Sequence, residues 1–227
     1  MFFHPLDFLI IIAFGLSLWA QFKVKGNFQK FSKIKASSEM TGAEIARKLL
    51  DRNGLYNVSV ENVRGALTDH YDPIKKAVRL SDSVYPSNSI AAISVAAHEV
   101  GHAIQHSESY GALVVRHKMF PIVNFTSGIA PFLLIGGFLL GSLNLLGLGI
   151  VFFSAVVVFQ LITLPVEFNA SNRARSLMVS EGMIVNTEEN GVKKVLNAAA
   201  LTYVAAALLS LLQLLKFIAI FSQGNRE

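Results

Sequence analysis

The sequence predicts a mainly α-helical, polytopic membrane protein with about four transmembrane helices and a small cytosolic α+β part. The mean hydropathy is +0.49, and only 15% of the 227 residues are charged, against roughly a quarter in soluble proteins. The apolar residues gather in four runs, and one sizeable polar stretch separates the first run from the second. A soluble globular class is therefore excluded.

The four runs are each close to the roughly 20 apolar residues that cross a bilayer as a helix. They cover about residues 6–22, 120–140, 143–164 and 198–221. A secretory signal peptide is the alternative for the first run. That run has no basic residues before it and no small-residue cleavage site after it, so a retained anchor is favoured.

The net charge of +5 comes largely from basic residues that flank the first run. Five lysines follow it between residues 23 and 35, whereas residues 1–7 have no basic residue. By the positive-inside rule, residues 23–118 and 165–197 face the cytosol and the N-terminus lies outside. This pattern indicates contact with anionic lipid rather than with nucleic acid. There is no cysteine, so disulfides and thiolate metal sites are excluded.

The polar regions, about 30–118 and 165–190, are interpreted as parts of one domain that includes the whole chain, residues 1–227. Thr41 and Glu44 form a capping-box pattern at the start of a helix, and Asn53-Gly54 is typical of its end. Residues 58–63 and 76–80 are predicted strands, with a loop over 65–73 between them.

A second helix of this region is predicted to begin near residues 87–88 and to reach a break at Gly111. Residues 165–178 are also expected to be helical. Asn186 and Glu189 resemble a cap for the helix that becomes the fourth span.

The strongest chemical signal is the sequence HEVGH at residues 98–102. His98 and His102 are four residues apart, so they lie about 40° apart around a helix and can reach one zinc ion. Glu99 stands beside such a metal and can accept a proton from an activated water. A pair of histidines without a metal is the alternative. It is disfavoured because this apolar helix would otherwise contain a costly polar cluster.

A catalytic zinc needs a third protein ligand and one open position. Glu167 is favoured because two spans separate it from the motif, which returns it to the same side of the membrane. A capping or snorkelling glutamate is the alternative. His106 lies about 80° round the helix from His98, and it would instead suit a surface or closed structural site. His4, His70 and His117 have no motif around them.

Several stretches together resemble the YugP-like, zinc-dependent neutral metallopeptidases of bacterial membranes. They are DHYDP at 69–73, VRLS at 78–81, VY at 84–85, SIAA at 89–92, AAHEVGHAIQ at 96–105 and LPVEFNAS at 164–171. The architecture is also distantly similar to HtpX-type and CAAX-prenyl-protease-type gluzincins.

These resemblances imply a zincin-like polar part with one Zn²⁺ per chain, and they imply the third ligand role for Glu167. In the relatives an aspartate stands four residues after that glutamate, whereas this chain has Ser171 there. A serine can still hydrogen-bond a ligand histidine, but the charge is missing.

The same resemblance implies a membrane-bound zinc metalloendopeptidase that hydrolyses peptides or proteins, including membrane proteins, from the cytosolic face of the bacterial plasma membrane. In that wider group an edge strand beside the zinc holds extended substrate. Residues 77–81 are the candidate, against an ordinary packed strand: Ala77, Val78, Arg79, Leu80 and Ser81. Candidate oxyanion donors, against solvated or packed side chains, are Arg173, Arg175, Tyr71 and Tyr203.

Two rival functions remain at this stage. An intramembrane protease would take an aspartate ligand from another span, and the apolar runs offer only Asp7, at the far end of the first run. A membrane scaffold or chaperone-like protein would have a structural metal or none. Residue patterns alone leave the oligomeric state and the substrate open.

Overall fold

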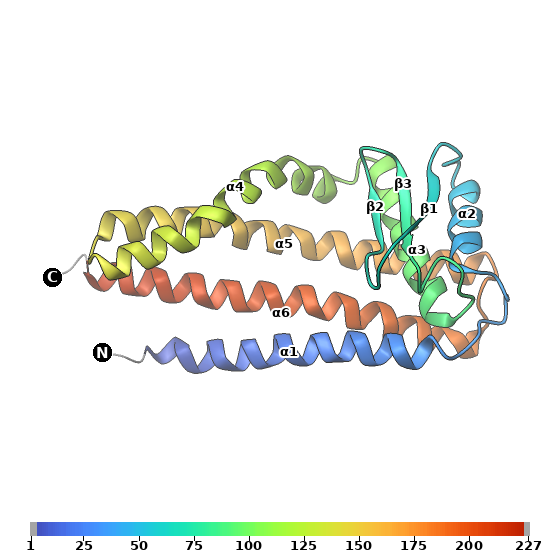
Figure 1. The fold of residues 1–227 in the computed structure, drawn as a ribbon, viewed down its shortest axis with the longest axis horizontal. Helices are drawn as coiled ribbons and strands as arrows, with labels where there is room; N and C mark the ends of the chain where they lie inside the picture. Colours follow the sequence, from blue (N-terminus) through green and yellow to red (C-terminus); the bar gives the residue numbers. More distant parts are fainter. Residues whose placement is uncertain (1–3, 225–227) are drawn as a thin grey trace. The chain divides into compact units, whose positions relative to one another are not determined.

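The computed structural model describes residues 4–224 and is mainly α-helical, with a small three-stranded sheet (Figure 1). The predicted fold class is therefore confirmed. In chain order the elements are α1 (Pro5–Phe31), α2 (Gly42–Arg52), β1 (Ser59–Val63), β2 (His70–Asp72), β3 (Ala77–Ser81), α3 (Ile90–Ser107), α4 (Gly111–Leu139), α5 (Leu143–Ser180) and α6 (Asn186–Gly224).

Four helices, α1, α4, α5 and α6, are long and apolar enough to cross a membrane by length and composition. Each covers one of the four predicted apolar runs to within one residue and extends beyond it at one end or at both. The helix that contains the third run, for example, extends from Leu143 to Ser180.

The chain forms two compact units. The first, here called the helical unit, contains residues 1–19, 114–164 and 202–227, of which 4–19, 114–164 and 202–224 are described. The second, here called the mixed unit, contains residues 20–113 and 165–201. The polar region and its motifs belong to the mixed unit.

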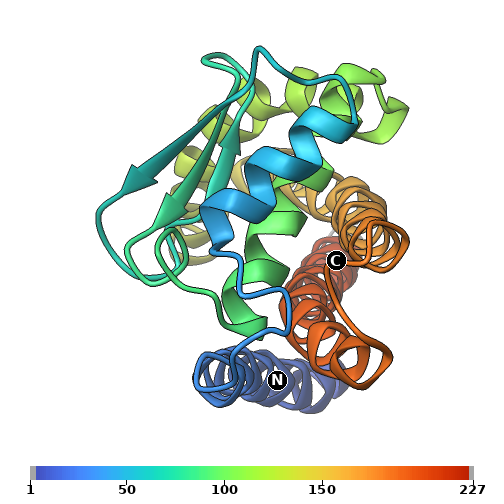
Figure 2. The same ribbon diagram turned by 90° about the vertical axis from the view of Figure 1, so that its right-hand side faces the viewer.

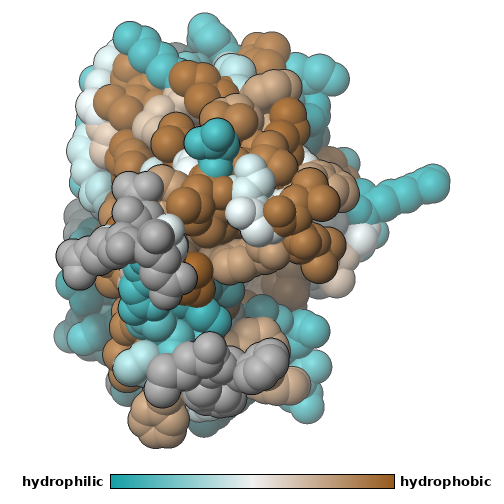
Figure 3. Space-filling view, turned by 90° about the vertical axis from the view of Figure 1, so that its left-hand side faces the viewer, coloured by the Kyte–Doolittle hydropathy of each residue, from teal (hydrophilic) through white to brown (hydrophobic). Residues whose placement is uncertain are grey.

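The helical unit has a small core and a largely apolar exterior. Leu134, Leu146 and Ile150 are buried together, and phenylalanines from α5 and α6 pack against them. Hydrophobic side chains cover much of the face seen in Figure 3 outside the grey residues. Such an exterior suits a surface that lipid covers. Inside this unit Lys216 forms an ion pair with Asp7 at 2.5 Å.

The mixed unit is built around α3, whose residues are mostly buried. Figure 2 shows α2 lying across α3, with the three strands to one side. The capping box at Thr41 and Glu44 is present as predicted, and Gly54 has the positive φ of +72° that the end of α2 requires. Ser89 caps α3 by accepting a hydrogen bond from the amide of Ala92, so this helix begins at Ile90, two to three residues after the predicted start.

The sheet has the order β1-β3-β2, with β1 parallel and β2 antiparallel to β3. Two predictions are wrong here. Residues 70–72 form a strand inside the predicted loop, because β3 offers them a pairing partner: Tyr71 lies opposite Val78. Residues 77–81 form the central strand rather than an edge, because both sides of β3 are paired.

The start of α6 also differs from its predicted cap. The carboxylate of Glu188, not that of Glu189, accepts a hydrogen bond at the helix start, from the amide of Val185. Glu188 also binds the amide and the hydroxyl of Ser37, at 2.7 and 2.8 Å. The cap therefore lies one residue earlier and connects this helix to the segment after α1.

Candidate metal centre

Three side chains converge in the mixed unit, two from α3 and one from α5. The Nε2 atoms of His98 and His102 lie 3.3 and 3.6 Å from Oε2 of Glu167. Within the described residues, this is the group whose ligand atoms come close enough together to hold a metal ion, all within 4.8 Å of one another. The structure therefore brings together the three predicted ligands.

The spacing of these atoms fits a tetrahedral metal site. With zinc–ligand bonds of 2.0–2.1 Å, the ligand atoms of a regular tetrahedron are about 3.3–3.4 Å apart. The two distances between the imidazoles and the carboxylate are close to that edge length. The Glu167 side chain is only 4% exposed, and a buried carboxylate needs a cationic partner. Two imidazoles and a carboxylate are also a nitrogen–oxygen donor set that zinc accepts.

The opposite ring nitrogen of each histidine has a side-chain partner. Nδ1 of His98 lies 3.2 Å from the Ser171 hydroxyl, and Nδ1 of His102 lies 3.0 Å from Oε1 of Gln105. Both rings therefore direct Nε2 toward Glu167. The expected hydrogen bond between Ser171 and a ligand histidine is present.

Glu99 follows the first histidine and is buried, with 8% of its surface exposed. Burial raises the pKa of Glu99, and the nearby carboxylates of Glu167 and Asp69 add to this, while the two histidines oppose it. Burial alone would lower the pKa of His102, but the Glu167 carboxylate raises it overall. Glu99 is therefore a carboxyl group with increased proton affinity beside the cluster, as a general base requires.

The backbones of α3 and α5 touch at Gly101, inside the HEVGH motif. A Cβ atom at this position would lie 2.7 Å from the carbonyl oxygen of Ala170, closer than packing allows. The absent side chain lets the helix with both histidines approach the helix with Glu167. This role of Gly101 was not predicted, although a glycine inside a helix is a sequence signal of close approach between backbones.

The other histidines lie outside the cluster. Nδ1 of His106 is 2.8 Å from the Tyr71 hydroxyl, and Nδ1 of His70 is 2.8 Å from the carbonyl oxygen of Thr68. His4 and His117 belong to the helical unit. None of them is a member of the metal-ligating group.

The candidate oxyanion donors have other contacts. Arg173 binds Asn169 and Glu108, and Arg175 lies 3.7 Å from Glu189 with 38% of its side chain exposed. The Tyr71 hydroxyl is bonded to His106, and Tyr203 belongs to the helical unit. An oxyanion role for any of these four side chains stays a prediction.

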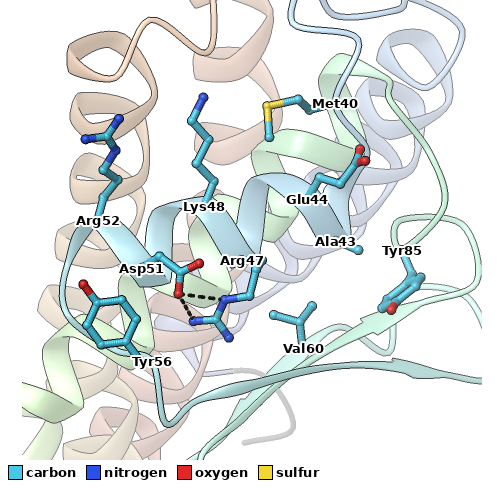
Figure 4. A pocket seen from close by; sticks show the side chains of 10 residues that line it. All are labelled: Met40, Ala43, Glu44, Arg47, Lys48, Asp51, Arg52, Tyr56, Val60 and Tyr85. Carbon is cyan, nitrogen blue, oxygen red and sulfur yellow. Dashed lines mark hydrogen bonds and ion pairs between the residues drawn. The ribbon is translucent and has the colours of Figure 1, made fainter.

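One groove of the mixed unit lies away from the three ligands. It encloses about 780 Å³ between α2, Tyr56, Val60 and Tyr85, and no metal-ligating residue lines it (Figure 4). Arg47 and Asp51 are one turn apart on α2, point toward each other and form an ion pair at 2.7 Å (Figure 4). We assign no role to this groove, because most of its charges are paired within the protein.

The fold and the cluster together define a class: a membrane protein with four candidate spans and an HExxH helix whose histidines meet a glutamate from a later helix. The family model described as "Putative neutral zinc metallopeptidase" matches residues 6–222. The chain belongs to this family.

One curated relative is similar over almost the whole chain. It is the "Putative membrane protease YugP" of Bacillus subtilis (strain 168), 70% identical over 220 residues, which are 97% of this chain and 98% of the relative. The resemblance seen in the sequence is thereby confirmed. No solved structure matches this chain.

Proposed function

We propose that this protein is a membrane-bound zinc metalloendopeptidase in which His98, His102 and Glu167 hold one Zn²⁺ and Glu99 is the general base. The carrying observation is the convergence of two Nε2 atoms and one carboxylate oxygen at 3.3 and 3.6 Å, from helices far apart in the sequence. Membership of a zinc metallopeptidase family supports the same assignment.

The metal ion and Glu99 have separate roles in the proposed mechanism. When bound, zinc supplies Lewis acidity that activates water and polarises a carbonyl group at neutral pH. Glu99 accepts the proton of the attacking water and then donates it to the leaving amine. Its burial suits both steps, because the raised pKa favours taking up a proton that is later given away.

The edge strand that holds substrate is reassigned to β2. Residues 77–81 are paired on both sides, so they offer no free edge. Among the described residues, the strand His70–Asp72 lies at an edge of the sheet, and it contacts α3 through Tyr71, whose hydroxyl binds His106. An extended peptide that adds to this edge would lie along the helix that contains both histidines.

The proposed location is the bacterial plasma membrane, with the mixed unit in the cytosol and the N-terminus outside. The basic residues that follow the first apolar run support this orientation. The substrate class is peptides or proteins, including membrane proteins near the bilayer surface.

The test is to purify the protein in detergent and to measure its zinc content and its cleavage of casein or a fluorogenic peptide. Glu99→Gln should keep one zinc per chain and lose about 10²- to 10⁴-fold in cleavage rate. Glu167→Gln should lose both zinc and cleavage. His106→Gln is the matched control and should keep its zinc, because His106 is outside the cluster.

The same experiment separates the rivals. A scaffold with a structural metal would bind zinc in the wild type but cleave nothing. An intramembrane protease would depend on Asp7, so Asp7→Asn would remove metal. The Asp7 carboxylate is already bonded to Lys216, which disfavours that reading. Full cleavage activity in Glu99→Gln would overturn the proposal.

A further inference from the structure

A chain of hydrogen bonds leads away from His102 and connects α3 to α5. Oε1 of Gln105 lies 3.0 Å from Nδ1 of His102. Nε2 of Gln105 donates to the carbonyl oxygen of Val166 at 2.8 Å and to Oδ1 of Asn169 at 2.9 Å. Arg173 Nε donates to the same Asn169 oxygen at 2.7 Å.

The far end of this chain is held by an ion pair. An Nη atom of Arg173 lies 2.7 Å from Oε2 of Glu108, the residue at which α3 ends. The partners on α3 and those on α5 recur at intervals of three or four residues, so each set lies along one helical face. The chain therefore fastens the two helices together next to the metal cluster.

The direction of every bond in this chain is fixed at the α5 end. A guanidinium group can only donate, so the oxygen of the Asn169 amide must face Arg173. A backbone carbonyl can only accept, so the Gln105 amide must turn its nitrogen toward Val166 and Asn169. Its oxygen is then left facing His102.

The orientation of the Gln105 amide determines the tautomer of the His102 imidazole. An amide oxygen only accepts, so Nδ1 of His102 must carry the proton, and the lone pair must lie on Nε2. Nε2 is the atom that faces Glu167. Gln105 is fully buried, with 0% exposure, so no water can take over its bonds if they are lost.

We propose that Gln105, Asn169 and Arg173 are positioning residues that hold His102 in the tautomer with a proton on Nδ1 and Nε2 free to bind metal. This inference rests on the proposed function, since it assigns the purpose of the chain to metal binding. His98 differs, because its partner Ser171 is a hydroxyl that can donate or accept and so fixes no direction.

A pair of near-isosteric variants tests the proposal. Asn169→Asp keeps an oxygen for both donors, whereas Asn169→Leu removes it. In competition with a chromophoric zinc chelator, Gln105→Leu and Asn169→Leu should weaken zinc affinity by about 10- to 100-fold. Asn169→Asp should stay within about threefold of wild type, and the exposed Asn172→Leu, on the same helix, is the control for helix effects.

A second readout follows the proton itself. In zinc-loaded protein labelled with ¹⁵N-histidine, the His102 Nδ1 proton should give a slowly exchanging NMR signal, which Gln105→Leu should lose. Affinities are compared only among variants with wild-type melting profiles. If Gln105→Leu does not fold, the zinc affinities of Asn169→Leu and Asn169→Asp test the proposal.

Failure of the positioning role and failure of the proposed peptidase function give different results. Folded Gln105→Leu or Asn169→Leu protein with wild-type zinc affinity would overturn the positioning role. Equal losses in Asn169→Leu and Asn169→Asp would also overturn it, since acceptor chemistry would then not matter. Zinc binding by a wild-type protein that cleaves no peptide would refute the proposed peptidase but would leave these affinity comparisons readable.

Discussion

The Ser171 hydroxyl lies 3.2 Å from Nδ1 of His98, four residues after Glu167 on α5, so one helix contributes both a ligand candidate and the partner of another. An uncharged oxygen here stabilises the imidazole less than a carboxylate does. We expect Ser171→Asp to raise zinc affinity and Ser171→Ala to lower it, each by up to about tenfold. Chelator competition measures both, and the opposite order would contradict the role of Ser171.

The contact between Gly101 and Ala170 makes a second prediction. Gly101→Ala places a methyl carbon 2.7 Å from a backbone oxygen, so the two helices must separate, at a cost of about 1–3 kcal/mol. Gly26→Ala is the matched control, because a Cβ there meets nothing within 4 Å and alanine favours a helix. Melting curves should show a lower Tm for the first variant only, with reduced zinc content.

Metal removal should destabilise the protein. In the proposed site, zinc would bind the folded cluster and not the unfolded chain, so metal at a hundred times Kd should add about 2.7 kcal/mol to the free energy of unfolding. We expect EDTA to lower the Tm of wild-type protein and zinc to restore it. Glu167→Gln should show a much smaller response, and an equal response in that variant would mean that the metal binds elsewhere.

Arg175→Gln should leave cleavage within about twofold of wild type. The side chain is 38% exposed and lies 3.7 Å from Glu189, and such surface pairs contribute little. Peptide assays compare Arg175→Gln with Arg173→Gln, whose side chain belongs to the hydrogen-bond chain that leads to His102. A large loss in kcat for Arg175→Gln alone would restore that arginine as an oxyanion donor.

Asp69 predicts a pH dependence of stability. Burial raises the pKa of Asp69, even though Ser81 donates two hydrogen bonds to it. With a raised pKa, the folded protein binds the proton of Asp69 more tightly than the unfolded chain does. The protonated carboxyl group therefore contributes to stability at low pH, and this contribution is lost as pH rises through the folded-state pKa. Asn at this position can keep both contacts to Ser81 without a charge. In melting curves, the stability of wild type relative to Asp69→Asn should therefore fall as the pH rises above about 4, the ordinary pKa of an aspartate.

The sequence predicted the elements that depend on local chemistry. The spans follow from apolar length, α2 from its capping box, and the site from the spacing of His98 and His102. Glu167 was predicted as the third ligand from its position at the end of a span and from the topology, and the family resemblance implied the same role. The cluster geometry agrees with that choice.

Features that depend on contacts between distant segments were missed. The strand at residues 70–72 exists because β3 pairs with it, and a run of three residues has no periodicity to detect. The roles of Gln105 and Asn169 depend on which faces of α3 and α5 meet. Gln105 is three residues after His102, a spacing that places both on one helical face, but its partners lie 61 and 64 residues away.

The distance along the chain between the two halves of the cluster has a consequence during synthesis. His98 and His102 leave the ribosome before the apolar segments of α4 and α5, and Glu167 leaves only after them. A nascent chain therefore has an incomplete ligand set until both segments have been translated. In the proposed enzyme, the metal site therefore cannot form, and peptide cleavage cannot begin, before the segment that contains Glu167 has been translated.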